Sequence, residues 1–66
     1  PGWIATPLTA GLQDDPARSE AILSRTPMRR WGEPGDLAGP ALFLTTPMAG
    51  FMTGTVIPVD GGYAVA

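Results

Sequence analysis

Side chains that could perform acid–base or nucleophilic chemistry are few in this sequence. Its only basic side chains are Arg18, Arg25, Arg29 and Arg30, and Lys, His and Cys do not occur. Arginine stays protonated and is a poor general base, so the usual pairs of nucleophile and base cannot be assembled from this set. Zinc sites built from Cys and His are excluded because neither residue type occurs. The sequence therefore predicts no catalytic residue and no metal site in this chain.

Carboxylates are the remaining candidate acids, and two of the six are adjacent. Neighbouring residues on a helix point in different directions, and the order Asp14-Asp15-Pro16 is typical of a helix start. We therefore interpret Asp14 and Asp15 as a solvated helix N-terminus. Thr53 and Asp60 lie at the two ends of a predicted strand, and we interpret both as residues that form hydrogen bonds in turns and loops.

Length, charge and hydropathy exclude several classes of function. The 66 residues allow one small domain, and the formal net charge of −2 argues against a nucleic-acid partner, which requires a basic surface. The longest apolar cluster, residues 41–44, is far shorter than the ~20 residues of a membrane helix. No basic and apolar signal segment opens the sequence. We expect a cytoplasmic protein that binds neither nucleic acid nor a membrane.

Three prolines predict the helix starts. Thr6-Pro7 and Asp15-Pro16 predict two short helices within residues 7–26, with Thr6 capping the first. Glu33-Pro34 predicts the longest helix, over residues 33–46. The apolar residues of that helix recur at helical spacing: Leu37, Ala38, Ala41, Leu42 and Leu44.

One segment, residues 55–59, has the β-branched and apolar character of a strand. Pro58 within it cannot donate a hydrogen bond to a neighbouring strand, which favours an edge position. The sequence Asp60-Gly61-Gly62 predicts a turn, and one alternative pairs residues 63–65 back as a hairpin. A single strand leaves backbone groups unpaired, and a two-stranded ribbon is only marginally stable. We therefore expect the remaining strands of the sheet to come from residues outside this chain.

Three separated motifs resemble the short-chain dehydrogenase/reductase family. Residues 1–6 (Pro-Gly-Trp-Ile-Ala-Thr) resemble its Pro-Gly-x-Ile/Val-x-Thr segment, residues 30–38 the start of its last long helix, and residues 51–62 its final strand and turn. The resemblance implies an α/β fold. The chain would be the C-terminal part of a Rossmann-like, doubly wound parallel sheet, in the order loop, two short lid helices, one long helix and final strand.

The resemblance divides the chain into parts of a single Rossmann-type domain: a cofactor loop (1–6), a substrate lid (7–26), the last long helix (33–46) and the last strand (54–60). It implies that the Ile4 backbone meets the nicotinamide carboxamide of NAD or NADP, and that the Thr6 hydroxyl reaches the carboxamide or the pyrophosphate. A carboxamide both donates and accepts hydrogen bonds, as a backbone does. The candidate cofactor-binding residues are Pro1, Gly2, Ile4 and Thr6.

Other side chains are candidates for contacts with the substrate. Four apolar residues could line a pocket wall, and packing between helices explains them equally well: Trp3, Leu8, Leu12 and Ile22. Arg29 and Arg30 could meet a substrate carboxylate, but we interpret them as solvated or as members of intersubunit ion pairs. Tyr63 is not assigned a catalytic role, because no Lys stands four residues after it as in the family's Tyr-x-x-x-Lys pair.

The implied activity is hydride transfer between NAD(P) and a secondary alcohol or ketone. The sequence Trp31-Gly32-Glu33-Pro34 resembles members acting on sugar acids, such as gluconate or deoxygluconate dehydrogenases, and also 3-oxoacyl reductases. We expect the chain alone to be an inactive C-terminal fragment that requires the upstream remainder of its subunit. The family implies dimers or tetramers joined through the last helix and strand. The alternative function is a non-enzymatic, small helical interaction module.

Overall fold

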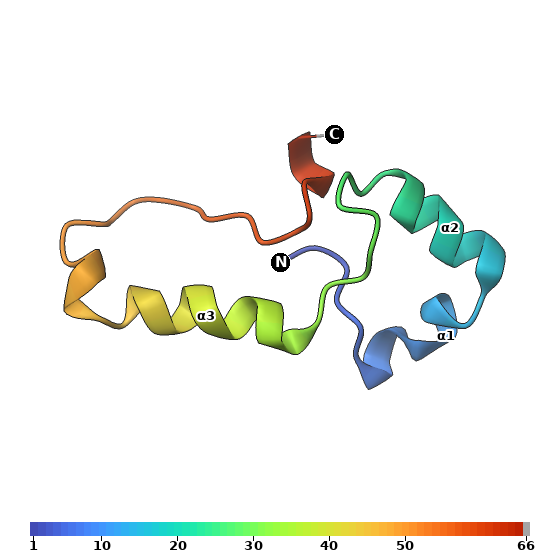
Figure 1. Ribbon diagram of the computed structural model, residues 1–66, viewed down its shortest axis with the longest axis horizontal. Helices are drawn as coiled ribbons and strands as arrows, with labels where there is room; N and C mark the ends of the chain where they lie inside the picture. The colour runs from blue at the N-terminus through green and yellow to red at the C-terminus, as the bar shows by residue number, and fades with distance from the viewer. Residues whose placement is uncertain (66) are drawn as a thin grey trace.

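The computed structural model describes residues 1–65 as helices joined by extended segments. The elements in chain order are η1 (Pro7–Thr9), α1 (Ala10–Gln13), α2 (Pro16–Ser24), α3 (Pro34–Leu44), η2 (Pro47–Ala49) and η3 (Tyr63–Val65), where η marks a 3-10 helix. Figure 1 shows α1 and α2 together at one end, α3 extending to the other, and the chain after η2 running back toward the N-terminus. Within residues 1–65, no helix combines the length and the apolar character needed to cross a bilayer.

The helices begin at the prolines that the sequence marks. Pro7, Pro16 and Pro34 each occupy the first position of a helix, where a missing N–H costs no hydrogen bond. The Asp15 carboxylate caps α2, because its Oδ1 accepts hydrogen bonds from the N–H groups of Ala17 at 3.1 Å and Arg18 at 3.2 Å. The interpretation of Asp15 as a helix cap is confirmed.

Helix α3 has an apolar composition but no buried residue. Pro40 lies inside it and removes one intrahelical hydrogen bond, yet the helix continues to Leu44. Among its large side chains, Leu42 is 68% exposed and Phe43 39% exposed. The apolar side of α3 therefore has little to pack against within residues 1–65.

The expected strand over residues 54–60 is not formed by this chain. Among residues 1–65, the one β contact is an isolated parallel bridge between Ile4 and Gly32. A strand exists through its hydrogen bonds to a neighbour, and no segment within residues 1–65 pairs with residues 54–58 in that way. The hairpin alternative is wrong, because residues 63–65 form the 3-10 helix η3.

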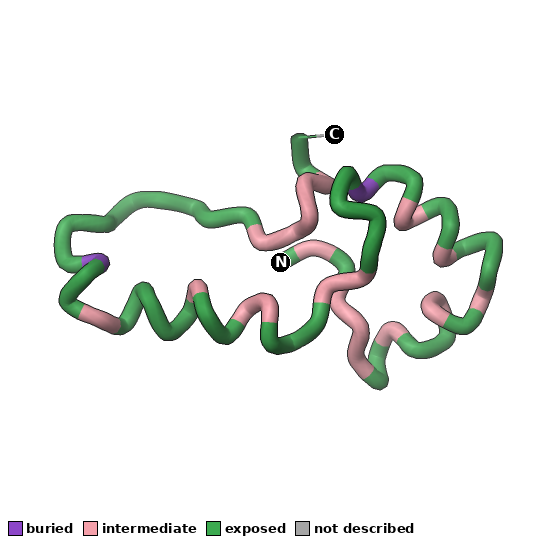
Figure 2. The backbone as a smooth tube through the Cα atoms, viewed as in Figure 1, coloured by how far each residue is buried: buried purple, intermediate pink, exposed green. Residues whose placement is uncertain are grey.

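The chain has almost no interior of its own. Thr26 and Ala49 are the two buried residues among those described (Figure 2). The radius of gyration is 14.0 Å, against about 11 Å for a compact domain of this length. The accessible surface is 4873 Å², against about 4,000 Å² for a folded monomer of this mass. The fold therefore needs further apolar surface to pack against.

We predict that the isolated 66-residue chain does not unfold cooperatively and oxidises no alcohol. Hydrophobic burial is the main stabilising contribution to a fold, and within residues 1–65 the one buried apolar residue is Ala49. Circular dichroism of the purified peptide should give a broad, non-sigmoidal melt with fast amide exchange. A sigmoidal melt with dispersed amide NMR signals would contradict the prediction and favour the self-sufficient interaction module.

Candidate functional site

The loop formed by residues 1–6 is held against the connector that precedes α3. The Gly32 N–H donates to the Trp3 carbonyl oxygen at 2.9 Å, and the Ala5 N–H donates to the Gly32 carbonyl oxygen at 2.7 Å. A Cβ at Gly32 would lie 2.6 Å from Ile4 Cδ1, so a larger residue would require the end of the Ile4 side chain to move. The two backbone hydrogen bonds fix the loop against Gly32.

This pairing sets the direction of both polar backbone groups of Ile4. In a trans peptide the C=O and the following N–H point in opposite directions, and no peptide among the described residues is cis. Since the Trp3 carbonyl points to Gly32, the Ile4 N–H points away from it. Since the Ala5 N–H also points to Gly32, the Ile4 carbonyl points away as well. Ile4 therefore presents a donor and an acceptor on one side of the loop.

The C-terminal turn holds the beginning of the same loop. The Gly2 N–H donates to the Val59 carbonyl oxygen at 3.0 Å, and the Met28 N–H donates to the Gly61 carbonyl oxygen at 3.0 Å. A Cβ added to Gly2 would lie 2.6 Å from Asp60 Cβ. Three segments that are distant in the sequence therefore meet at this point.

Asp60 organises the turn with both of its carboxylate oxygens. Oδ1 accepts a hydrogen bond from the Gly62 N–H at 2.9 Å, and Oδ2 accepts one from the Ala64 N–H at 3.0 Å. Gly61 and Gly62 have φ angles of 64° and 93°, which glycine adopts without steric cost. The interpretation of Asp60 as a turn residue is confirmed.

Thr6 is the N-cap residue of the first helix, as the sequence predicts. The first turn is a 3-10 turn, in which the Thr9 N–H bonds to the Thr6 carbonyl oxygen at 3.1 Å. The same N–H faces the Thr6 side chain in a capping box, although the hydroxyl forms no cap hydrogen bond of full strength. The Thr6 hydroxyl therefore contributes weakly to the helix start and can still contact a ligand.

A second threonine and a glutamine, which sequence reasoning missed, connect the loop to α1. Thr9 Oγ1 donates to the Ile4 carbonyl oxygen at 2.7 Å and accepts from the Thr6 N–H at 3.1 Å. Gln13 Nε2 donates to Thr9 Oγ1 at 2.9 Å and to the Thr6 carbonyl oxygen at 3.2 Å. The spacing of four residues between Thr9 and Gln13 on a helix was the available signal.

The candidate site residues are only partly brought together. A pocket of about 380 Å³ is lined by Trp3 and Ile4 together with residues of the connector, α3 and the C-terminal turn. Leu8 is 95% exposed, whereas Leu12 and Ile22 are half-buried on the helices α1 and α2. None of these three lines that pocket. Pro1 is exposed at the beginning of the loop.

Two tryptophans join the loop, the connector and α2. The rings of Trp3 and Trp31 meet edge to face, with centroids 6.2 Å apart and an interplanar angle of 79°. Trp31 Nε1 donates to Ser19 Oγ on α2 at 3.0 Å. Trp3 is 38% exposed, so one side of its ring packs within the chain while another remains open.

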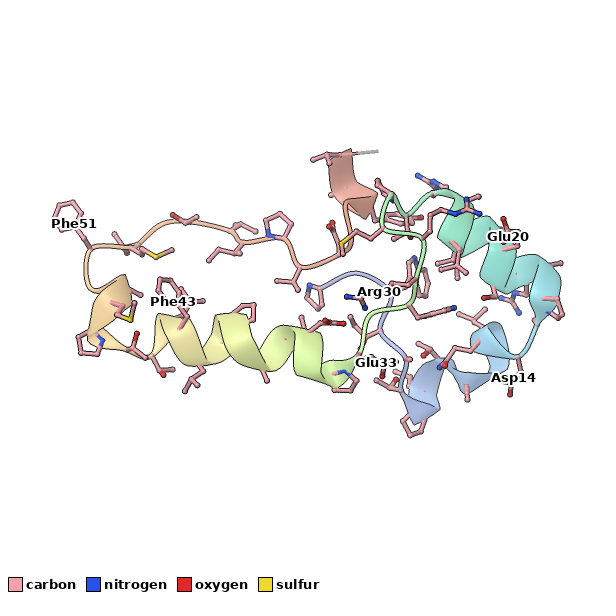
Figure 3. All side chains as sticks on the ribbon, in the orientation of Figure 1. Asp14, Glu20, Arg30, Glu33, Phe43 and Phe51 are labelled. Atoms are coloured by element: carbon pink, nitrogen blue, oxygen red, sulfur yellow. The ribbon has the colours of Figure 1, made fainter. Side chains whose placement is uncertain are left out.

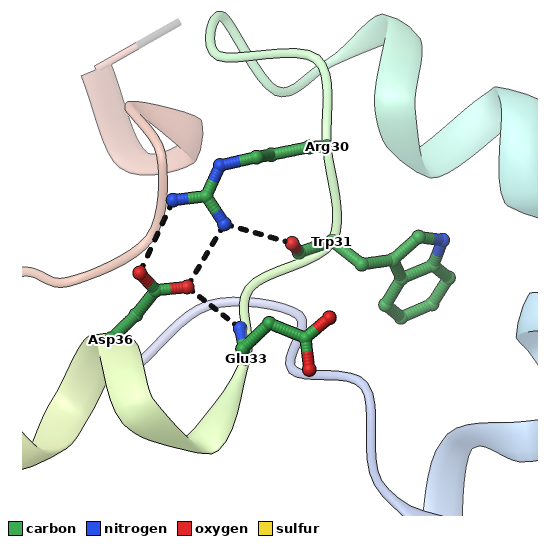
Figure 4. A network of polar contacts seen from close by, with 4 residues as sticks. All are labelled: Arg30, Trp31, Glu33 and Asp36. Atoms are coloured by element: carbon green, nitrogen blue, oxygen red, sulfur yellow. Dashed lines mark hydrogen bonds and ion pairs between the residues drawn. The ribbon is translucent and has the colours of Figure 1, made fainter.

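Arg29 and Arg30 each form an ion pair within the chain. Arg29 Nη2 lies 3.3 Å from Glu20 Oε1. Arg30 contacts both carboxylate oxygens of Asp36, at 2.9 and 3.2 Å (Figure 4). Both arginine side chains remain at least half exposed, so the expected solvation is present.

Asp36 is the most perturbed carboxylate near the loop. Hydrogen bonds from the Arg30 guanidinium, and next from the Glu33 N–H at 2.7 Å, lower the pKa of Asp36 to about 2. The hydrogen bond with Asp36 in turn raises the pKa of Arg30. Asp36 is therefore a structural anion at neutral pH and is unsuited to act as a general acid.

The other polar contacts do not add a reactive group to the site. The Arg25 guanidinium lies over the Tyr63 ring, 4.9 Å from its centroid. Within residues 1–65, no cluster of three acidic, His or Cys side chains could hold a metal ion. What the loop offers chemically is recognition, through the donor and acceptor of Ile4 and the hydroxyl of Thr6.

The known proteins that this chain resembles are named as dehydrogenases or reductases. Residues 1–64 match the family described as enoyl-(acyl carrier protein) reductase. The chain is 46% identical over 65 residues to galactitol 2-dehydrogenase (L-tagatose-forming) of Cereibacter sphaeroides, covering 98% of this chain and 26% of that protein. It is 48% identical over 63 residues to 2-dehydro-3-deoxy-D-gluconate 5-dehydrogenase of Pseudoalteromonas atlantica, covering 96% of this chain and 25% of that protein.

A solved structure agrees closely with the whole chain. It is an Agrobacterium tumefaciens protein, provisionally named a 2-deoxy-D-gluconate 3-dehydrogenase, with bound NADP. The TM-score is 0.95 at 44% sequence identity, covering 100% of this chain and 27% of that one.

The chain belongs to the short-chain dehydrogenase/reductase family. The structures it resembles are Rossmann-fold proteins of that family. The chain spans about a quarter of the length of the curated relatives that it matches.

In the full-length protein that contains this chain, we predict that Arg30→Gln raises the pKa of Asp36 from about 2 toward its ordinary value near 3.8. A lowered carboxylate pKa stabilises the fold above the unfolded-state value, and this contribution is lost as the pH falls toward 2. The carboxyl resonance of Asp36 should be titrated by NMR. Arg29→Gln is the matched control, because Arg29 pairs with Glu20; an equal shift in both variants would refute the assignment to Arg30.

Proposed function

We propose that this chain completes one subunit of an NAD(P)-dependent oxidoreductase. The enzyme transfers hydride between the nicotinamide and a secondary alcohol or ketone. Membership of the family supports the reaction class. The observation that carries the proposal is the placement of the Ile4 N–H and C=O on one side of the loop. Such a pair complements the amide of a nicotinamide, which has one acceptor oxygen and an N–H donor group.

Each part of the loop has a role in this proposal. Ile4 binds the carboxamide with its backbone, and the Thr6 hydroxyl, which forms no cap hydrogen bond of full strength, binds the carboxamide or the pyrophosphate. Gly2, pressed against Asp60, keeps the beginning of the loop close to the C-terminal turn. Pro1 leads the chain into the loop. NAD or NADP, when bound, supplies or accepts the hydride.

Proton transfer requires groups from outside this chain. The 66 residues contain no Lys or His, so Tyr63 has no Lys four residues after it. We propose that the chain is the C-terminal part of its protein, and that the preceding residues supply the catalytic groups and the other strands of the sheet. The role of this chain is to bind and orient.

A sugar acid or a related polyol is the proposed substrate class. The names of the two curated relatives described above refer to a deoxygluconate and a sugar alcohol. A 3-oxoacyl substrate is the alternative. Residues 7–26 would serve as the lid over the substrate. Leu12 and Ile22 of the lid, together with Trp3 of the loop, would face the substrate. The exposed Leu8 would pack against it when the lid closes.

Self-association is proposed for the other end of the chain. Residues 54–60 would form the last strand of the sheet, and α3 would lie beside it. Phe51 is fully exposed and Val56 is 88% exposed, and Figure 3 shows Phe51 pointing outward beyond the end of α3. Exposed apolar side chains of this size suggest burial against an identical subunit across a two-fold axis, giving a dimer or a tetramer.

The cofactor proposal predicts the effect of Thr6→Val in the full-length protein. Loss of one hydroxyl contact should raise the dissociation constant for NADH or NADPH roughly 2- to 10-fold. The melting temperature should change less, because the Thr6 hydroxyl forms no cap hydrogen bond of full strength. Nicotinamide fluorescence measures binding, and reduced-nicotinamide absorbance measures the oxidation of sugar acids. Thr6→Ser is the control and should bind like the parent. If the parent binds neither nucleotide, the proposed function is wrong.

The assembly proposal predicts that a charge on the extended segment reduces the oligomeric state. Val56→Glu and Ile57→Glu place a carboxylate on opposite faces of the proposed strand, so at least one should enter the interface. Sedimentation velocity should show smaller species for that variant in the full-length protein. Thr53→Glu, outside the strand, is the control. Two folded variants with the parent's oligomeric state would locate the interface elsewhere.

A further inference from the structure

The hydroxyl of Thr9 lies where the cofactor loop meets helix α1, and all of its hydrogen-bonding capacity is used. A hydroxyl has one proton and two lone pairs. The proton is donated to the Ile4 carbonyl oxygen at 2.7 Å, with the Thr6 carbonyl oxygen farther away at 3.2 Å. The lone pairs accept from the Thr6 N–H at 3.1 Å and from Gln13 Nε2 at 2.9 Å.

These contacts act on the two residues that are proposed to recognise the nicotinamide. The Ile4 carbonyl points away from Gly32, on the side where Thr9 meets it. A carbonyl oxygen has two lone pairs, so the bond from Thr9 occupies one and leaves the other for a ligand. The Thr6 N–H is held by Thr9, while the Thr6 hydroxyl makes no cap hydrogen bond.

Gln13 extends this network onto α1. Its amide donates both to Thr9 Oγ1 and to the Thr6 carbonyl oxygen at 3.2 Å. Thr9 and Gln13 are half-buried, as are Ile4 and Thr6. Partial burial strengthens hydrogen bonds, and bonds that share a group reinforce one another. The loop and the first lid helix are therefore joined by side chains rather than only by the chain between them.

We propose that Thr9 is a positioning residue for the nicotinamide ring, and that Gln13 holds Thr9 in place. Thr9 touches no cofactor itself. It fixes the directions of the Ile4 carbonyl and the Thr6 amide, so that the loop is ready to accept the carboxamide. This inference deepens the proposed function and rests on it, because it requires that Ile4 and Thr6 bind the nicotinamide.

The test compares two ligands in the full-length protein. One is the reduced cofactor that the parent binds, NADH or NADPH. The other is ADP-ribose, or its 2′-phosphate for an NADP enzyme, which lacks the nicotinamide. Thr9→Val should weaken binding of the reduced cofactor roughly 3- to 10-fold, the range for one hydrogen bond, and leave binding of the ADP-ribose ligand unchanged. Thr9→Ser keeps the hydroxyl and should restore binding of the reduced cofactor.

Two further variants complete the design. Thr45→Val removes a hydroxyl that bonds to the Leu42 carbonyl oxygen at 2.7 Å in the last turn of α3, and it should leave binding of both ligands unchanged. Gln13→Met keeps the length of the side chain and removes its amide. It should weaken binding of the reduced cofactor by a smaller factor than Thr9→Val does, and leave binding of the ADP-ribose ligand unchanged. If Thr9→Val does not fold, Gln13→Met provides the test.

The outcomes separate this inference from the proposed function. If the parent binds the reduced cofactor and Thr6→Val weakens that binding, but Thr9→Val and Gln13→Met bind like the parent, only the role of Thr9 is overturned. Equal weakening of both ligands, or no recovery with Thr9→Ser, also overturns it, because a general loss of structure would explain either result. A parent that binds no nicotinamide nucleotide overturns both proposals.

Discussion

The backbone pairing of residues 3–5 with Gly32 is the interaction on which the rest of the site depends. It consists of two hydrogen bonds between main-chain groups, at 2.7 and 2.9 Å. Because peptide groups are planar, these bonds decide which way the Ile4 N–H and C=O point. The bonds from Gly2 and Met28 stabilise the loop, and the bond from Thr9 holds the Ile4 carbonyl in the direction that the pairing sets. The side chain of Ile4 lies close to Gly32, because a Cβ there would be 2.6 Å from Ile4 Cδ1.

Local chemistry in the sequence was enough to predict the helix starts and the turn. Pro16 with Asp15, and the sequence Asp60-Gly61-Gly62, form their structures with hydrogen bonds between residues at most four apart. Thr6 is the N-cap residue that the sequence predicts, but its carbonyl oxygen, rather than its hydroxyl, accepts the hydrogen bond from the Thr9 N–H. The contacts of Thr9 with Ile4 and Thr6 depend on the path of the loop in space. The spacing of residues in the sequence does not give that path.

The remaining differences arise from contacts that lie beyond local sequence. Residues 55–59 have the composition of a strand, but a strand forms only beside a partner, and this chain provides none for them. The pairs of Arg29 with Glu20 and of Arg30 with Asp36 span nine and six residues, which are not helical spacings. They form because the connector turns back toward α2 and α3. The resemblance of three motifs to the family predicted the family correctly, which local propensities alone do not do.

The hydrogen bond between Gly2 and Val59 has a consequence for how the protein is synthesised. A loop of nearly the full length of this chain must close before the bond can form, and closing a long loop is entropically costly and slow. A growing polypeptide emerges from the ribosome in order, so residues 1–6 are exposed well before Val59 and the Asp60 turn appear. The beginning of the loop, at Gly2, is thus among the last features to be fixed, and premature termination shortly before Val59 would leave the pairing with Gly32 as its main anchor.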